Sequence, residues 1–276
     1  MDTIKDKTIS TRSAELLAHF NGAEQFCFTV GEAQAVLSGS KPDAVRRLLS
    51  DMTRRGLLLR LKEGLYHVIP YEKDPDTFVP DWHLVAGCLA GDVDHYIGYY
   101  SALQIHSLIT QPSLREQIVV NRQLKPAVLT VKDVPFQFIY HNTQHFFGAK
   151  STWVDSYNKV RYSDLEKTFV DCLFKPDYGG GIGEIAKALF KSREKLDYGK
   201  LLDYARRFGS QAVVKRLGFL LELLEVNHPA VEELHKLRTD AVVLLEPSYA
   251  AQGRILSRWS LRQNVDTEPI VSSLTT

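Results

Sequence analysis

The stretch from residue 40 to residue 68 constrains the fold of this chain more than any other part of the sequence. As a helix from Lys41 to Arg55, it places its large apolar side chains on one stripe, at Val45, Leu48, Leu49 and Met52. The opposite face is polar. Gly56 comes next, and glycine readily takes the left-handed conformation that ends many helices. The pattern predicts an amphipathic helix that buries one face.

The residues on either side of this helix predict its start and the element after it. Ser40 is a candidate N-cap, and Asp43 is placed to reach back to it as in a capping box. After the helix, Leu57–Leu61 and Leu65–Ile69 have the composition of short strands, and the Lys-Glu-Gly between them suits a hairpin turn. A polar helix joined directly to a hairpin is typical of a winged helix-turn-helix.

The positive charge of the chain is concentrated in the same stretch. Between Ser40 and Gly64 there are seven Lys or Arg residues and three Asp or Glu residues, whereas the whole chain has a net charge of only +1. A basic helix and wing suit the phosphate backbone of double-stranded DNA. The predicted DNA-binding residues are Ser40, Lys41, Asp43, Arg46, Arg47, Ser50, Arg54, Arg55, Arg60 and Lys62. The alternatives are a solvated helix face and a protein-contact surface.

Composition indicates an ordinary globular protein with no membrane segment. At 276 residues the chain is long enough for two domains, and no run of about 18 apolar residues occurs in it. The N-terminal residues lack the apolar core of a signal peptide, so we expect a cytoplasmic protein. Cys27, Cys88 and Cys172 are widely spaced and lie in apolar surroundings, which predicts three buried thiols in a reducing compartment.

A segment rich in charge and proline marks the predicted domain boundary. Residues 71–81 contain two prolines and five charged residues, and they show no hydrophobic period. We therefore predict a winged helix-turn-helix domain at 1–72, a linker at 73–81 and a larger domain at 82–276. Because short β-type segments precede a run of helical ones after residue 115, the predicted fold class is α/β, of the α+β kind.

Two features of the larger domain have the residue types of a small-molecule or metal site. The glycines from Gly179 to Gly183 come after a turn rather than a strand, which argues against a dinucleotide site, so no cofactor is expected. His141 and His145 lie at a strand end and turn, where their spacing does not favour metal binding, so no metal site is expected. The chain shows no convincing catalytic constellation, and we predict that the protein is not an enzyme.

A third feature is a basic helical pair between Tyr198 and Glu225. It carries aromatic residues beside Arg206, Arg207, Lys215 and Arg216. These four residues indicate a second contact surface, for nucleic acid or an acidic partner, although a helical hairpin with solvated cations gives the same pattern.

The order of motifs along the chain resembles one known family, the AbiEi-type antitoxins, which are transcriptional regulators of toxin–antitoxin modules. After the helix and hairpin, the motifs that carry the resemblance are Gly98–Leu103 with His106, Phe138–His141, Val160–Thr168 with Asp171-Cys172-Leu173, Gly179–Gly181 and Ala212–Gly218. The resemblance covers nearly the whole chain. The Val160–Thr168 and Ala212–Gly218 blocks are its most specific parts.

The resemblance implies a repressor and antitoxin. The N-terminal domain would bind inverted repeats in its own promoter. The C-terminal domain would counteract a cognate nucleotidyltransferase-like toxin without an obligatory stable complex, which is the type IV mode, and no membrane is involved. Two alternatives stay open: a stand-alone regulator whose second domain senses a ligand or dimerises, and an enzyme acting on nucleic acid. For the enzyme, the sequence offers only scattered candidates such as Asp92, Asp94 and His95.

Overall fold

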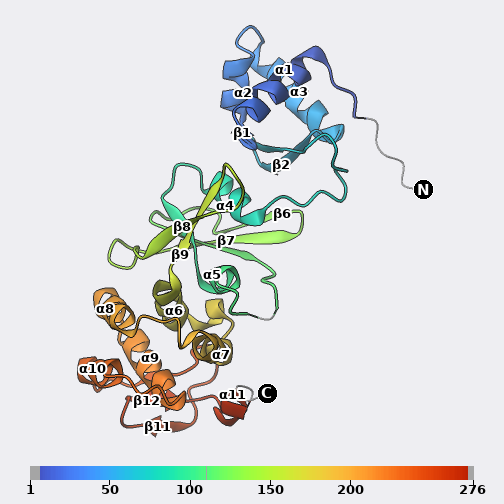
Figure 1. The fold of residues 1–276 in the computed structure, drawn as a ribbon. Coiled ribbons are helices and arrows are strands. Elements are labelled where there is room, and N and C mark those ends of the chain that lie inside the picture. The colour runs from blue at the N-terminus through green and yellow to red at the C-terminus, as the bar shows by residue number, and fades with distance from the viewer. Residues whose placement is uncertain (1–6, 110, 273–276) are drawn as a thin grey trace. The chain divides into compact units, whose positions relative to one another are not determined.

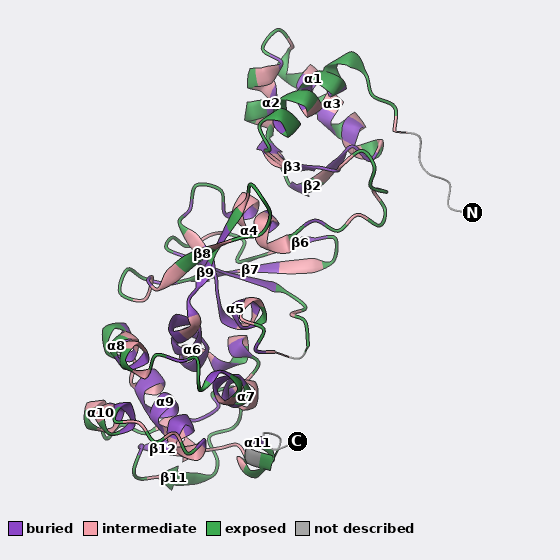
Figure 2. Cartoon of the chain, viewed as in Figure 1, coloured by how far each residue is buried: buried purple, intermediate pink, exposed green. Residues whose placement is uncertain are grey.

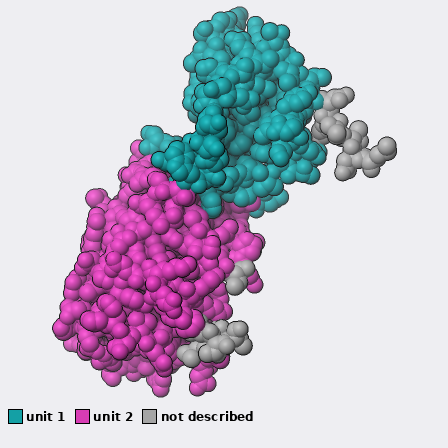
Figure 3. Space-filling view, in the orientation of Figure 1, with its two compact units in different colours: residues 1–92, 131–133, 153–160 teal, residues 93–130, 134–152, 161–276 magenta. Residues whose placement is uncertain are grey.

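The fold is mixed α/β, as the sequence predicts, and the computed structural model describes residues 7–109 and 111–272. The chain forms two compact units (Figure 1, Figure 3). Unit 1 comprises residues 1–92, 131–133 and 153–160, and unit 2 comprises residues 93–130, 134–152 and 161–276. Unit 1 therefore extends past the linker predicted at 73–81. None of the helices in the described residues is long and apolar enough to cross a membrane.

The N-terminal part of unit 1 contains three helices and a small antiparallel sheet, with the strand order β1-β3-β2. Its elements in chain order are α1 (Thr11–Gly22), β1 (Cys27–Thr29), α2 (Val30–Val36), α3 (Pro42–Arg54), β2 (Leu58–Lys62) and β3 (Leu65–Val68). The amphipathic helix and the hairpin predicted from the sequence are thus confirmed as elements. The predicted stripe of α3 packs into the core through Val45, Leu49 and Met52, while Leu48 is half-buried.

The starts of α2 and α3 are stabilised differently. Thr29 and Glu32 form a complete capping box at α2, in which the Thr29 N–H donates to the Glu32 carboxylate at 2.7 Å. The prediction that Ser40 caps α3 is wrong, because Pro42 is the first helical residue and the cap position falls on Lys41. Proline suits this first position because its missing N–H would have no partner there.

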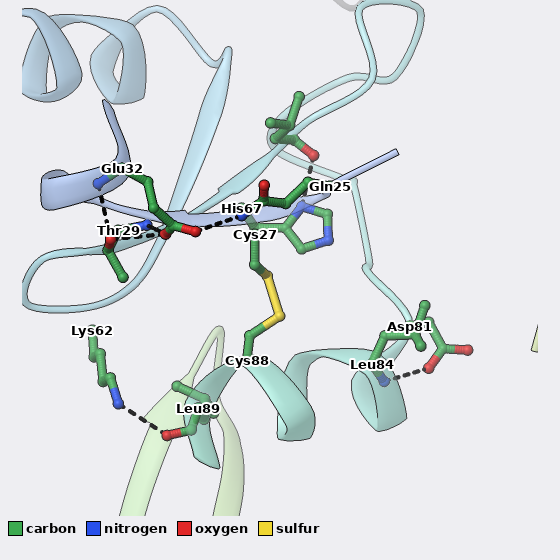
Figure 4. Close-up of a disulfide and its surroundings, with 11 residues drawn as sticks. Gln25, Cys27, Thr29, Glu32, Lys62, His67, Asp81, Leu84, Cys88 and Leu89 are labelled. Carbon is green, nitrogen blue, oxygen red and sulfur yellow. Dashed lines mark hydrogen bonds between the residues drawn. A yellow bond between two sulfur atoms is a disulfide. The ribbon is translucent and has the colours of Figure 1, made fainter. Parts of the chain in front are cut away.

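A disulfide joins β1 to the helix after the predicted linker. Cys27 is bonded to Cys88 of α4 (Trp82–Ala90), 61 residues later in the chain, with the two Cα atoms 6.2 Å apart (Figure 4). Both cysteines are half-buried, so the prediction of buried thiols is wrong for them and holds only for Cys172, which is free and buried. This bond is one reason why α4 belongs to unit 1.

A six-stranded mixed sheet, built largely from unit 2, has the strand order β6-β7-β5-β4-β9-β8. Its strands are β4 (His95–Ile97), β5 (Glu116–Val120), β6 (Val128–Val131), β7 (Val134–Tyr140), β8 (Ala149–Trp153) and β9 (Lys159–Ser163). The central strand β5 runs antiparallel to β4 and parallel to β7. Every residue of β5 is buried, as expected for a strand covered on both faces.

Most helices of unit 2 come after the six-stranded sheet in the chain, whereas α5 lies between β4 and β5, and a second, small sheet has the order β10-β12-β11. These elements are α5 (Tyr99–Ile105), α6 (Leu165–Phe174), the 3-10 turn η1 (Pro176–Gly179), α7 (Ile182–Ser192), α8 (Tyr198–Phe208), α9 (Gln211–Leu223), α10 (Ala230–Leu237), β10 (Val243–Leu244), β11 (Arg254–Leu256), β12 (Leu261–Gln263) and α11 (Glu268–Ser272). Figure 2 shows that α6 and α9 are buried along much of their length.

Close packing of α9 depends on a glycine. A Cβ atom added at Gly218 would lie 2.1 Å from ring atoms of Trp259, which is itself almost completely buried. The indole N–H of Trp259 also donates to the Glu222 carboxylate, which fixes the ring in place. The ring therefore has little freedom to move away from α9.

We predict that Gly218→Ala destabilises the protein by about 3 kcal/mol, because the ring or the helix must shift to admit the methyl group. Gly183→Ala in α7 is the matched control, since its added Cβ would meet only Ile270 at 3.8 Å. The control should change the free energy of unfolding by less than about 1 kcal/mol in urea titrations. Equal stability of the two variants would contradict this account of the packing.

Candidate functional site

The polar face of α3 presents three arginines to solvent. Arg46, Arg47 and Arg54 are all exposed, and Ser50 lies exposed among them. Arg47 has no hydrogen-bond or ion-pair partner among the described residues. The other two face nearby aspartates: Arg46 lies 3.5 Å from Asp43, and Arg54 forms a close ion pair with Asp51.

Both arginines remain available to bind a phosphate in spite of these ion pairs. The side chains of Arg46 and Arg54 are 68% and 81% exposed, and exposed pairs of this kind contribute only about 0–1 kcal/mol. A phosphate can therefore replace the aspartate at little cost. Lys41 at the start of α3 and Arg60 on β2 are also exposed, and their side chains have no ion-pair partner within the described chain.

Two of the predicted DNA-binding cations have partners within unit 1, although Arg55 is half-buried and Lys62 is exposed. Arg55 forms an ion pair with Asp51 at 2.9 Å, and its guanidinium also donates to the Ser13 hydroxyl at 3.1 Å. Lys62 donates through Nζ to the Leu89 carbonyl at 2.9 Å, near the end of α4 (Figure 4). These two cations therefore have intramolecular partners that the sequence did not predict.

Two further predicted DNA-binding residues, Ser40 and Asp43, carry no positive charge and have partners within unit 1. Ser40 is half-buried, and its carbonyl accepts a hydrogen bond from Gln34 at 2.7 Å. Asp43 serves as the partner of Arg46. The free cationic face, as we name it, consists of Lys41, Arg46, Arg47, Arg54 and Arg60.

Two of the four residues predicted to form a basic surface in unit 2 are buried. Lys215 and Arg216 are 0% and 4% exposed. The Lys215 ammonium donates to the Ala241 carbonyl. The Arg216 guanidinium donates to the Leu244 carbonyl at 2.8 and 3.1 Å and to the Leu173 carbonyl at 2.7 Å. Burial lowers the pKa of Arg216 to about 10, so it stays charged at neutral pH.

The physical reason for this correction is the position of α9. Other elements of unit 2 surround the helix, so its polar side chains meet backbone carbonyls of neighbouring segments instead of water. Arg206 and Arg207, on α8, are exposed. Arg206 pairs with Glu233 at 3.0 Å, and the Arg207 guanidinium lies over the Phe147 ring at 4.0 Å.

A buried polar network that sequence reasoning missed links α6 to the sheet of unit 2. Lys167 and Asp171, one turn apart on α6, form a close ion pair. The Tyr96 hydroxyl of β4 donates to Asp171 at 3.0 Å and accepts from Lys167 at 3.0 Å. His141, just after β7, lies 3.8 Å from Asp171 and is bonded to the Tyr99 hydroxyl at 2.8 Å. The only signal in the sequence is the i, i+4 spacing of the lysine and aspartate.

The electrostatics of this network favour a fixed structure over proton transfer. Burial lowers the pKa of Lys167 and raises that of Asp171, and the ion pair opposes both changes. The rings of Phe147 and Phe208 lie 4.9 and 5.1 Å from the Lys167 ammonium. Burial, together with that ammonium, lowers the pKa of His141 to about 3, so the imidazole is neutral at physiological pH.

The structure also places the histidine pair and the glycine run that the sequence analysis considered as metal and cofactor sites. The rings of His141 and His145 lie 6.0 Å apart, and the second imidazole is bonded to the Phe208 carbonyl. No three His, Cys, Asp or Glu side chains in the described parts of the chain could hold a metal ion. At the glycine run, the Ile182 N–H that opens α7 donates to the Glu246 carboxylate at 2.9 Å, so this helix start already has an anionic partner.

Comparison with known proteins adds a likeness of fold. The chain matches no protein-family model and no curated protein. It is similar to the crystal structure of the RV2827C protein from Mycobacterium tuberculosis, with a TM-score of 0.70 and 17% sequence identity over 99% of this chain and 97% of that chain. The two proteins therefore share a fold over nearly their whole length.

We predict that Asp171→Asn destabilises the protein by about 3–5 kcal/mol, because it leaves the Lys167 ammonium buried without its counter-charge. The double variant Lys167→Met/Asp171→Asn should regain at least half of that loss. The control, Asp94→Asn, breaks the exposed pair with Arg161 and should cost less than about 1 kcal/mol in the same urea unfolding measurement. A small effect of Asp171→Asn would show that the pair is not essential to the unit.

Proposed function

We propose that this protein is a DNA-binding antitoxin that represses its own operon, and that unit 1 acts as a winged helix-turn-helix. The observation that carries the proposal is the free cationic face, where five cations lie on one helix and the adjoining strand while the apolar side of that helix is buried. In this proposal α3 is the recognition helix and the β2–β3 hairpin is the wing.

The chemistry of the exposed arginines supports major-groove binding. A guanidinium donates two parallel hydrogen bonds and so pairs with guanine or with a phosphate oxygen pair. Arg47 has no partner in the described chain, so its guanidinium is free to contact a phosphate or a base edge. Lys41, at the start of α3, and Arg60, on β2, suit phosphates, which set the position on the duplex without reading sequence.

The antitoxin part of the proposal rests on the family resemblance. In it, unit 2 counteracts a nucleotidyltransferase-like toxin by contact and performs no reaction. The most specific motifs of the resemblance contain Lys167, Lys215 and Arg216, which are buried. Because these side chains are buried, a contact with the toxin would use other residues. Arg206 and Arg207 are the members of the predicted surface that remain exposed.

We predict that the protein binds its own promoter with a slope of log affinity against log salt concentration near −4 to −5, from about five phosphate contacts per subunit. Arg47→Ala/Arg54→Ala should weaken binding strongly and reduce the slope by about two units. The matched control, Lys187→Ala/Lys195→Ala, removes two exposed cations of unit 2 and should bind normally. Fluorescence anisotropy with a labelled promoter duplex measures all three, and unchanged affinity of the α3 variant would refute the assignment.

For unit 2, we predict that Arg206→Glu/Arg207→Glu abolishes rescue from the cognate toxin while promoter binding stays intact. The measurement is growth during co-expression of toxin and antitoxin, with soluble antitoxin quantified. Lys187→Glu/Lys195→Glu is the charge-matched control and should rescue fully. If the α8 variant rescues as well as the control does, these two arginines are merely solvated. Reversal of Lys215 or Arg216 is uninformative, because it should disrupt folding.

A further inference from the structure

Two bonds tie α4 to the small sheet of unit 1. One is the Cys27–Cys88 disulfide to β1, and the other is the hydrogen bond from Lys62 of β2 to the Leu89 carbonyl (Figure 4). Leu89 is among the last four residues of α4, whose carbonyls have no partner within the helix. Lys62 therefore caps this helix end, and the disulfide keeps the helix end within its reach.

The position of Lys62 links this arrangement to the proposed DNA-binding surface. Lys62 ends the strand that also carries Arg60, one of the cations of the free cationic face. Its side chain is exposed, and within the described chain the bond to Leu89 is the one hydrogen bond that its ammonium makes. While α4 stays beside the sheet, the ammonium must give up its hydrogen bond to that carbonyl before it can contact a phosphate, which weakens the contact.

The two bonded cysteines are less buried than the third cysteine of the chain. Cys27 and Cys88 are half-buried, whereas Cys172 is completely buried in unit 2. The chain before α4, residues 70–81, forms no helix or strand. Without the covalent bond, α4 is held next to β1 and β2 by non-covalent contacts, among them the Lys62 hydrogen bond.

We propose that the Cys27–Cys88 bond is a redox-modification site for a dithiol reductant, and that its reduction frees Lys62 and strengthens DNA binding. A thiolate of the reductant attacks one sulfur, the disulfide breaks, and the other cysteine leaves as a thiolate that takes up a proton. The second thiol of the reductant then displaces the remaining cysteine. Two electrons and two protons pass to the protein, and the reductant becomes a disulfide. The effect on DNA rests on the proposed function.

The first experiment tests the site without DNA. The full-length protein is treated with dithiothreitol under native conditions and then with iodoacetamide, and the alkylated cysteines are mapped by mass spectrometry. Cys27 and Cys88 should be modified only after reduction, and Cys172 should stay unmodified until the protein is denatured. Limited proteolysis between residues 70 and 91 should become faster. Absence of alkylation at both cysteines of the reduced protein would overturn the proposal.

The second experiment tests the coupling to DNA. Reduced protein should bind the promoter duplex about threefold to tenfold more tightly at low salt, with a salt slope steeper by about one unit, the value of one added phosphate contact. Cys27→Ser/Cys88→Ser should behave like the reduced protein without any reductant, with folding checked by circular dichroism. In Lys62→Gln, the oxidised and reduced forms should bind alike.

The outcomes separate the two proposals. Equal affinity and slope of the oxidised and reduced protein would overturn the coupling. A redox response that persists in Lys62→Gln would overturn the role of Lys62, because another group would then carry the response. If neither form binds the promoter, the proposed DNA-binding function fails, while the alkylation pattern still decides whether the disulfide is a reducible site.

Discussion

The buried ion pair between Lys167 and Asp171 is the interaction on which unit 2 depends. It joins the first helix after the sheet to Tyr96 on β4 and, through His141, to the end of β7. A buried charge pair is tolerated only when its remaining donors and acceptors are also satisfied, and here the tyrosine and histidine groups satisfy them. Such an arrangement favours one register of helix against sheet, because a displacement would separate both charged groups of α6 from the Tyr96 hydroxyl.

Basic residues serve opposite purposes in the two units. On α3 the arginines project from a helix that is buried on one side only, so their charges face solvent and are available to a polyanion. On α9, Lys215 and Arg216 lie on a helix that is enclosed by its neighbours, and their donors are used up by carbonyls of the same chain. A charged residue on a helix is thus available to bind a partner only when that side of the helix faces solvent.

Sequence reasoning was most informative where structure is local. The apolar stripe of α3, the hairpin after it and the mixed α/β class all result from spacing and composition, and the structure has them. The pairing of Cys27 with Cys88 and the burial of Arg216 depend on contacts between segments far apart in the chain, which no local pattern encodes. The cap predicted at Ser40 is wrong by one residue. Pro42 is the first residue of α3, so the cap position falls on Lys41.

The segment after α10 has a consequence for the order in which unit 2 matures during synthesis. The Leu244 carbonyl receives Arg216, the Glu246 carboxylate receives the first N–H of α7, and the Trp259 ring rests on Gly218. During synthesis, Arg216, the Ile182 N–H and the surface at Gly218 therefore lack these partners until residues 244–259 leave the ribosome. Unit 2 is thereby a late-closing structure, and its nascent helices are a natural substrate for chaperones.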